Sequence, residues 1–223
     1  MVKKMNIFEA VINNDYQYLE HVLKYNKRFL LETPKEQVLT DNNVNDVYMK
    51  NTALHFAAEQ GNLEMCKFLV NHGADVNKTN IYGWTPAFSA FNGQKNFHKN
   101  LAKEHIEVIH YFISMPEFNI LHRSYNKLDL IGELIRKTQL WIFDIEKTVE
   151  SGRIVRKELV CIKDIRILMH SLINKGLDPN TLQGKNGDNA LTLASFHCKF
   201  FLFPLLLSYG LNYQHKNNFN QDF

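Results

Sequence analysis

The sequence is poor in the features that mark secreted, disulfide-bonded and membrane-spanning proteins. Its 223 residues include three cysteines, Cys66, Cys161 and Cys198, whose odd number and wide spacing argue against a disulfide framework. No run of about 18 apolar residues is present that would form a transmembrane helix. Near the N-terminus, Glu9 and Asn13 interrupt the apolar run that a signal peptide would need. These absences favour a cytoplasmic protein.

Motifs for catalysis and for cofactor binding are also missing. The chain has no P-loop, no G-x-G, no H-E-x-x-H, no C-x-x-C and no G-x-S-x-G. Its net charge of +3 is too small to indicate a nucleic-acid partner. We therefore predict no catalytic residue, no metal and no cofactor, and we expect neither nucleic acid nor membrane as a partner. The alternative is an enzyme with an unrecognised site near His105, Glu158 or Cys161.

Residues 52–77 (TALHFAAEQGNLEMCKFLVNHGADVN) are the most regular stretch of the chain. Thr52 is a typical N-cap, apolar residues then recur at helical spacing, and Gly61 predicts the end of the helix. A second apolar helical pattern begins at Leu63 and ends at Gly73. A pair of helices this short cannot bury both of its faces alone, so such units must stack on one another.

This stretch resembles one complete ankyrin repeat. Residues 83–90 (GWTPAFSA), in which Thr85 follows Thr52 by 33 residues, are similar to the family's G-x-T-P-L-H-x-A, and residues 187–194 (GDNALTLA) resemble it again. The resemblance implies an all-α ankyrin-repeat solenoid of about five helix–turn–helix repeats, and a non-enzymatic module that binds a partner protein. The irregular repeats are also similar to ankyrin effectors that intracellular bacteria deliver into host cells, which would place the chain in the host cytosol. A regulatory or inhibitory subunit of an enzyme is a further alternative.

The resemblance divides a single domain into successive units. The units are a cap repeat with a loop (1–47), repeat two (48–79), repeat three (80–120), repeat four (121–180), repeat five (181–213) and a tail (214–223).

The end of the array is a candidate dimer surface. Without further helices after the last unit, Leu205, Leu206 and Leu207 would be partly exposed.

The spacing of the repeats predicts two insertions. Taking Thr52, Thr85, Asn126 and Asn189 as equivalent gives intervals of 33, 41 and 63 residues, so repeats three and four carry extra residues. These fall between the two helices of each repeat and should project from one edge of the stack. In the larger insertion, about 136–164, apolar residues recur near helical spacing, which predicts a long helical hairpin with each helix extended by about 15 residues.

The turn of that predicted hairpin is basic. Residues 130–176 contain nine basic and six acidic residues, which accounts for the whole net charge of +3. Arg153, Arg156 and Lys157 are therefore candidates for contact with an acidic partner or an anionic membrane surface. The simpler interpretation is a solvated turn.

Partner contacts implied by the resemblance lie on the concave surface, where hairpin tips meet the exposed side of the inner helices. Ile81, Tyr82 and Trp84 stand out, because aromatic side chains on a hairpin are typical binding anchors. The alternative is that Trp84 packs on a neighbouring helix. The full set is Tyr48, Met49, Asn51, Glu59, Gln60, Ile81, Tyr82, Trp84, Asn92, Lys185, Asn186 and Asp188.

Two further roles come from the resemblance alone. His55 would hydrogen-bond the backbone of the neighbouring hairpin and hold the stack together. Its place is taken by Phe88, Asp129 and Thr192 in later repeats, which predicts less regular stacking there. Asn77 resembles the hairpin asparagine that asparaginyl hydroxylases modify.

Overall fold

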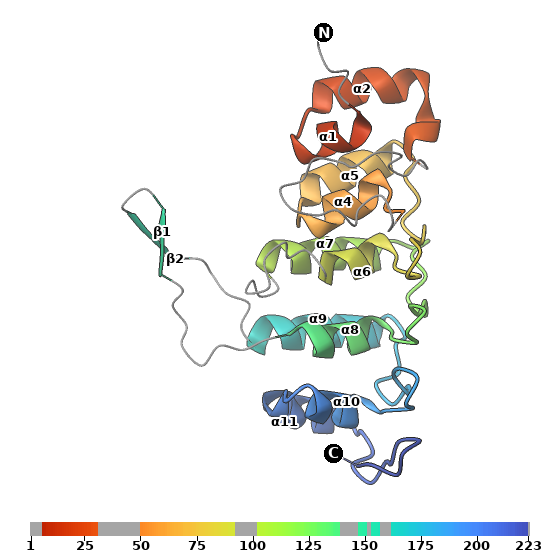
Figure 1. Ribbon diagram of the computed structural model, residues 1–223, viewed down its shortest axis with the longest axis vertical. Coiled ribbons are helices and arrows are strands. Elements are labelled where there is room, and N and C mark those ends of the chain that lie inside the picture. Colours follow the sequence, from red (N-terminus) through yellow and green to blue (C-terminus); the bar gives the residue numbers. More distant parts are fainter. Residues whose placement is uncertain are drawn as a thin grey trace.

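The computed structural model describes residues 6–30, 50–91, 102–138, 147–150, 153–156 and 162–222. These residues form a stack of helix pairs, with the N-terminal pair at one end and the C-terminal pair at the other (Figure 1). The hairpins that join successive pairs lie along one side of the stack (Figure 1). Such an array is stabilised mainly by contacts between neighbouring pairs.

The first helix of each pair packs against the first helix of the next along the stack. Within the described residues, these inner helices are α1 (Ile7–Ile12), α4 (Ala53–Glu59), α6 (Pro86–Phe91), α8 (Leu130–Lys137) and α10 (Ala190–Phe196). The outer helices are α2 (Tyr16–Tyr25), α5 (Leu63–Asn71), α7 (Lys103–Ser114), α9 (Ile162–Asn174) and α11 (Phe203–Ser208), with short 3-10 helices η1 (Lys27–Leu30) and η2 (Phe200–Leu202). The predicted all-α solenoid is confirmed.

Polar side chains explain where several helices begin. At α1, the Glu9 N–H donates to Asn6 Oδ1 at 2.8 Å and the Asn6 N–H donates to Glu9 Oε2 at 3.2 Å, a reciprocal capping box. At α5, Asn62 Oδ1 accepts the Met65 N–H at 3.0 Å. Helices as short as the 6 residues of α1 are nevertheless marginal alone. Packing within the stack must therefore supply most of their stability.

One apolar core runs through the stack. Ala57, Ala87 and Ala194 on the inner helices are fully buried, and their small side chains let neighbouring helices approach closely. Larger side chains fill the space beside the outer helices, as the fully buried Phe112 and Leu172 do. Burial of a side chain of that size contributes roughly 1.5–3 kcal/mol. Each helix pair thus depends on the pairs on either side of it.

Each hairpin turns at the same position, three residues before the first residue of the inner helix that follows it. Lys50, Gly83, Lys127 and Gly187 occupy this position, with positive φ angles of 53°, 68°, 60° and 70°. Glycine adopts the left-handed conformation without strain, whereas lysine does so at a cost of about 1 kcal/mol. The shared turn fixes the register of four repeats without reference to a consensus sequence.

This register corrects the predicted start of the fourth repeat. Asn126 lies in the hairpin, and Asp129 is the N-cap of α8, where its Oδ1 accepts the N–H groups of Ile131 and Gly132 at 2.9 Å. The starts of α4, α6, α8 and α10 are then 33, 44 and 60 residues apart. The extra residues still lie between the inner and outer helices of the third and fourth pairs.

The predicted helical hairpin in the fourth repeat is wrong. α8 ends at Lys137, Thr138 has an extended backbone, and the described part of α9 is Ile162–Asn174. Between them lie two antiparallel strands, β1 (Lys147–Glu150) and β2 (Arg153–Arg156), on the side of the stack opposite the hairpins between repeats (Figure 1). Thr-Val and Ile-Val occupy the middles of the strands, and Ser-Gly separates them in sequence. β-Branched pairs around a Ser-Gly dipeptide favour strands over helices.

The basic residues of this insertion are placed accordingly. Arg153 and Arg156 lie on β2 rather than on a helical turn, and Lys157 is outside the described residues. Among the residues that the structure describes, no helix is long and apolar enough to cross a bilayer.

Candidate functional site

In the second repeat, a buried histidine joins the inner helix to the next hairpin. His55 Nδ1 lies 2.7 Å from Thr52 Oγ1 and accepts the Thr52 N–H at 3.1 Å. Its Nε2 therefore carries the proton and donates to the Trp84 carbonyl oxygen at 3.0 Å. The predicted bond to the neighbouring hairpin is confirmed. Burial lowers the pKa of His55 to about 4, so the ring is neutral near pH 7.

In the fourth repeat, the side chain that joins the inner helix to the next hairpin comes from the hairpin instead of the helix. Gly132, three residues after the N-cap Asp129, takes the place that His55 has after its own N-cap. Gln183, from the following hairpin, donates through Nε2 to Asp129 Oδ2 at 2.7 Å, and its Oε1 accepts the Asp129 N–H at 3.1 Å. A Cβ atom at Gly132 would stand 2.5 Å from Gln183 Oε1. The absent side chain is what admits the Gln183 amide.

Hairpins held in this way present side chains at fixed positions. The rings of Tyr82 and Trp84 are 5.4 Å apart. The Tyr125 N–H donates to the Tyr82 carbonyl oxygen at 3.0 Å, and the Tyr125 ring covers Gly83, where a Cβ would be 2.7 Å from Tyr125 Cδ1. Ile81, Tyr82 and Tyr125 are 39%, 45% and 67% exposed. We refer to Ile81, Tyr82, Trp84 and Tyr125 as the hairpin-tip patch.

Two members of the patch differ from the expectation. Trp84 is half-buried and packs against the core, and its Nε1 is enclosed without a hydrogen-bond partner, so it mainly supports the patch from beneath. Tyr125 was missed because the repeat was started at Asn126. Counted from Asp129, Tyr125 lies four residues before the N-cap position, as Ile81 does in the third repeat.

Some residues predicted to contact a partner are structural instead. Asn51 is fully buried, and its Oδ1 accepts from Asn80 Nδ2 at 2.9 Å, which joins two hairpins. Glu59 is also buried, at the end of α4. The Asn51 oxygen is hydrogen-bonded within the fold, as most buried polar groups are. Their side chains are therefore not part of an exposed binding surface.

The other predicted contacts have mixed positions. Lys185 and Asn186 are exposed on the hairpin that precedes α10, and Gln60 is half-buried at the C-terminal end of α4. The remaining residues of the set, Tyr48, Met49 and Asn92, lie outside the described residues.

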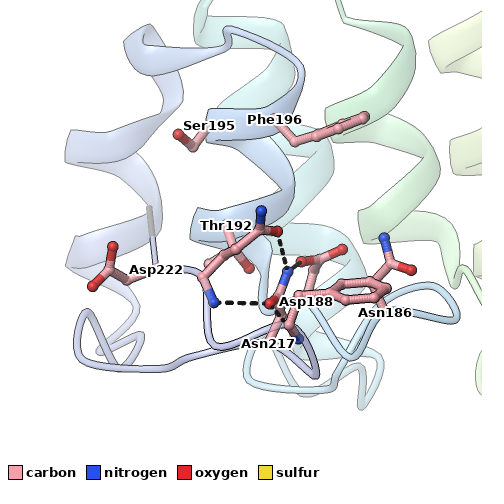
Figure 2. A pocket seen from close by; sticks show the side chains of 9 residues that line it. Asn186, Asp188, Thr192, Ser195, Phe196, Asn217 and Asp222 are labelled. Carbon is pink, nitrogen blue, oxygen red and sulfur yellow. Dashed lines mark hydrogen bonds between the residues drawn. The ribbon is translucent and has the colours of Figure 1, made fainter.

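A groove of about 650 Å³ lies beside the fifth helix pair (Figure 2). Phe196, at the end of α10, and Phe219, in the final hairpin, are 77% and 66% exposed. Asp188 is buried at the groove, and its Oδ1 accepts from Asn217 Nδ2 at 2.9 Å. The groove is lined by Asn186, Asp188, Thr192, Ser195, Phe196, Asn217, Phe219, Gln221 and Asp222. Two of these, Asn186 and Asp188, were predicted from the sequence.

The proposed modification site also joins two hairpins. Asn77 Nδ2 donates to the Glu117 carbonyl oxygen at 2.7 Å, and its Oδ1 accepts the Asn119 N–H at 2.8 Å. A hydroxylase would have to open this contact to reach the side chain. The structure thus assigns Asn77 a role in stacking that the sequence alone did not indicate.

Of the three residues named for an unrecognised enzyme site, the structure describes one. His105 is buried, with Nε2 3.0 Å from the Glu59 carbonyl oxygen, while Glu158 and Cys161 lie outside the described residues. Leu205 and Leu206 are buried in the core, which corrects the predicted exposed leucine surface; Leu207 alone of the three is exposed.

No group of three or more histidine, cysteine or carboxylate side chains within the described ranges is arranged to hold a metal ion.

Comparison with known proteins gives the same architecture. A family model described as ankyrin repeats, in three copies, matches residues 7–112. A segment of 35 residues is 54% identical to part of the potassium channel AKT1 of Arabidopsis thaliana, and it covers 16% of this chain and 4% of the channel. The crystal structure of an ankyrin repeat domain from Acinetobacter baumannii AYE has a similar fold, with a TM-score of 0.55 and 19% identity over 92% of this chain and 98% of that domain.

The two kinds of similarity complement each other along the chain. The family match covers nearly all of the first three helix pairs, and the structural similarity extends the same fold over the fourth and fifth. The hairpin turns and the His55 junction provide the physical basis of that fold. Residues 7–112 therefore match the ankyrin-repeat family, and the chain as a whole has the ankyrin-repeat fold.

Proposed function

We propose that this chain binds a partner protein through the hairpin-tip patch and the concave surface beside it. Ankyrin repeats generally act as protein–protein interaction modules and are typically non-enzymatic. The observation that carries the proposal is the exposure of Ile81, Tyr82 and Tyr125 on two hairpins that hydrogen-bond to each other. A cluster of large exposed apolar side chains on a folded surface is typical of an interaction site.

The energetics of the patch favour binding. Tyrosine combines a large apolar ring with a polar tip and is enriched among interface residues that dominate affinity. The backbone beneath Tyr82 and Tyr125 is fixed by the bond between their hairpins, and the Trp84 ring packs against Tyr82. Little conformational entropy is therefore lost when a partner covers these rings. Exposed Lys50 and Lys127 lie on the same row of hairpin tips and provide a polar rim.

The test is the effect of removing the tyrosine rings. A protein captured by the intact chain is purified, and its affinity is measured by calorimetry for the wild type, Tyr82→Ala and Tyr125→Ala. Each substitution should weaken binding at least tenfold, or about 1.4 kcal/mol. Tyr25→Ala is the matched control, because Tyr25 is 73% exposed at the end of α2, in the first helix pair of the stack. Wild-type affinity in both patch variants, with unchanged melting temperatures, would exclude the patch as the binding site.

A cytoplasmic location belongs to the same proposal. Cys66 is buried and Cys198 is exposed, and both are free thiols. Burial raises the pKa of the Cys66 thiol, which keeps it protonated and unreactive. Free thiols suit a reducing compartment. Fractionation of the producing cells should recover the protein with the soluble cytoplasmic contents, and recovery from an oxidising compartment would contradict this part of the proposal.

A further inference from the structure

We infer that the groove beside the fifth helix pair binds a cationic side chain, arginine or lysine, that the partner protein presents. The inference rests on the proposed function and specifies the chemistry of one anchor on the partner. Three properties of the groove carry it: its aromatic walls, the sign of its charge and its fixed frame.

The aromatic walls come from two different elements of the fold. Phe196 ends α10 and is 77% exposed, although Leu193 and Ala194 just before it are buried in the core. Phe219 lies in the final hairpin and is 66% exposed. Neither ring adds much to the core, so packing within the chain does not account for them. The face of an aromatic ring attracts a cation placed over it, and in proteins this cation is more often arginine than lysine.

The charge of the groove has one sign. Asp188 lines its buried part and the exposed Asp222 lines its rim, and Figure 2 shows them on either side of Thr192. No lysine, arginine or histidine side chain is among the described residues that line the groove. The other lining residues are amides, hydroxyls and the two phenylalanines. A concave site with carboxylates and no cation of its own favours a positively charged group and disfavours an acidic one.

Hydrogen bonds within the chain hold the frame of the groove in place. The Asn217 side chain donates to Asp188 Oδ1 at 2.9 Å, and the Asn218 N–H donates to the Asn186 carbonyl oxygen at 2.9 Å. Asn189 Nδ2 also donates to the carbonyl oxygen at the start of the final hairpin, at 2.7 Å. The hydrogen bond from Asn217 thus orients the Asp188 carboxylate, which reduces the ordering that binding requires.

Arginine fits this arrangement better than lysine. Its planar guanidinium offers several N–H donors, which suit carboxylate, amide and hydroxyl oxygens at once, while its flat face stacks on a phenyl ring. Lysine supplies the charge without the planar fork. We therefore expect arginine-containing segments to bind more tightly than the same segments with lysine.

The experiment selects peptides without knowledge of the natural partner. A displayed library of random peptides is panned on the intact 223-residue chain, and binders are sorted by their loss of affinity for Phe196→Ala. Peptides that depend on Phe196 should be enriched in arginine. Replacing that arginine with its neutral isostere citrulline should weaken binding at least tenfold, and replacing it with lysine should weaken binding less.

Charge variants test the carboxylates separately. Asp222→Asn should weaken the same peptides several-fold and make their binding less sensitive to salt, because screening acts on the charge that the variant lacks. Glu20→Gln is the control, since it removes an exposed carboxylate from α2 at the other end of the stack. Circular dichroism melts of all variants show whether the exposed positions can be changed without unfolding.

The outcomes separate this inference from the proposed function. Peptides that depend on Phe196 but are apolar or acidic would overturn the cationic anchor and leave protein binding in place. Binders that respond only to Tyr82→Ala would overturn the groove as a site and support the hairpin-tip patch. Binders that respond to neither would contradict both. Self-association in sedimentation experiments that Phe196→Ala abolishes would show that a second copy occupies the groove, which also overturns the inference.

Discussion

The second and fourth repeats join their inner helix to the next hairpin with opposite chemistry. In the second, His55 reaches out from the helix to the Trp84 carbonyl oxygen. In the fourth, Gln183 reaches back from the hairpin to the N-cap Asp129, through space that Gly132 leaves open. What the two repeats share is one buried, satisfied polar link, and not a particular residue. Stacking of apolar helices alone would leave the polar groups of the hairpins without partners.

The stability of the two junctions should also depend on pH in different ways. The link in the second repeat is a neutral ring, whereas that in the fourth involves a carboxylate that burial makes harder to ionise. Substitution and pH should therefore separate the two junctions. The expected effects are taken below from the largest to the smallest.

Asp129→Ala should have the largest effect. It removes the N-cap of α8, worth about 1 kcal/mol. It also leaves one N–H of the buried Gln183 amide without an acceptor, which costs roughly 1–3 kcal/mol more, while the bond from Gln183 Nε2 to the Thr181 carbonyl oxygen remains. We expect the free energy of unfolding in urea to fall by about 3 kcal/mol. Thr52→Ala is the matched change in the second repeat, where His55 keeps its bond to the next hairpin. It should lose only about 1 kcal/mol, and equal losses would remove the distinction between the junctions.

Acid should weaken the second junction. The folded-state pKa of His55, about 4, lies below its ordinary 6.5, so between these values the unfolded chain binds the proton more readily. The contribution of His55 is complete above pH 6.5 and is lost as the pH falls towards 4, by about 3 kcal/mol in total. Urea titrations from pH 7 to pH 4 should show this slope in the wild type and a smaller one in His55→Asn. The same slope in both proteins would assign the acid sensitivity elsewhere.

Asp129 should respond to pH with the opposite sign. Burial is the main cause that raises its pKa above 3.8, against the hydrogen bonds from Gln183 and from the helix. A raised folded-state pKa gives a contribution that is complete below 3.8 and is lost as the pH rises through the folded value. The fourth junction therefore partly offsets the acid sensitivity of the second.

Gly132→Ala should lower the free energy of unfolding by less than Asp129→Ala or acidification to pH 4 does. The added Cβ would lie 2.5 Å from Gln183 Oε1, so the amide must withdraw from Asp129. Against this, alanine favours a helix over glycine by about 1 kcal/mol. We expect a net loss of about 2 kcal/mol in the free energy of unfolding. In a Gln183→Ala background the same substitution should be neutral or stabilising, and simple additivity in the double-mutant cycle would mean that the two residues do not compete for space.

The second repeat could be predicted from sequence because its signals are local. Thr52, Gly61 and Gly73 mark helix ends, and His55 stands where the family places its bridging residue. The fourth repeat satisfies the same physical requirements with other residues. Lys127 adopts the left-handed turn that glycine usually occupies, so comparison with a consensus placed the start of the helix three residues too early.

The candidate site was predictable only in part, for a related reason. Tyr82 follows directly from an aromatic hairpin, but the exposure of Tyr125 and Phe196 depends on which segments pack over them. That depends on contacts between distant parts of the chain, which no local pattern contains. The prediction of helices in the insertion was wrong for a different reason, because short apolar runs fit the helical and the strand period equally well. Its β-branched pairs were the better signal.

The smallest change in stability is expected when the insertion is removed. Replacing residues 139–161 with a short Gly-Ser linker should alter the free energy of unfolding by less than about 1 kcal/mol, because loop closure depends weakly on length and β1 and β2 stand away from the helices (Figure 1). Deleting 136–164 instead is the informative control. It removes Arg136, whose Nη2 lies 2.7 Å from the buried Glu133 carboxylate, and shortens α9. An unpaired buried carboxylate should cost about 3 kcal/mol. If the shorter deletion proves as damaging, the insertion is part of what holds the fourth repeat, and its difference from the second is not confined to the junction.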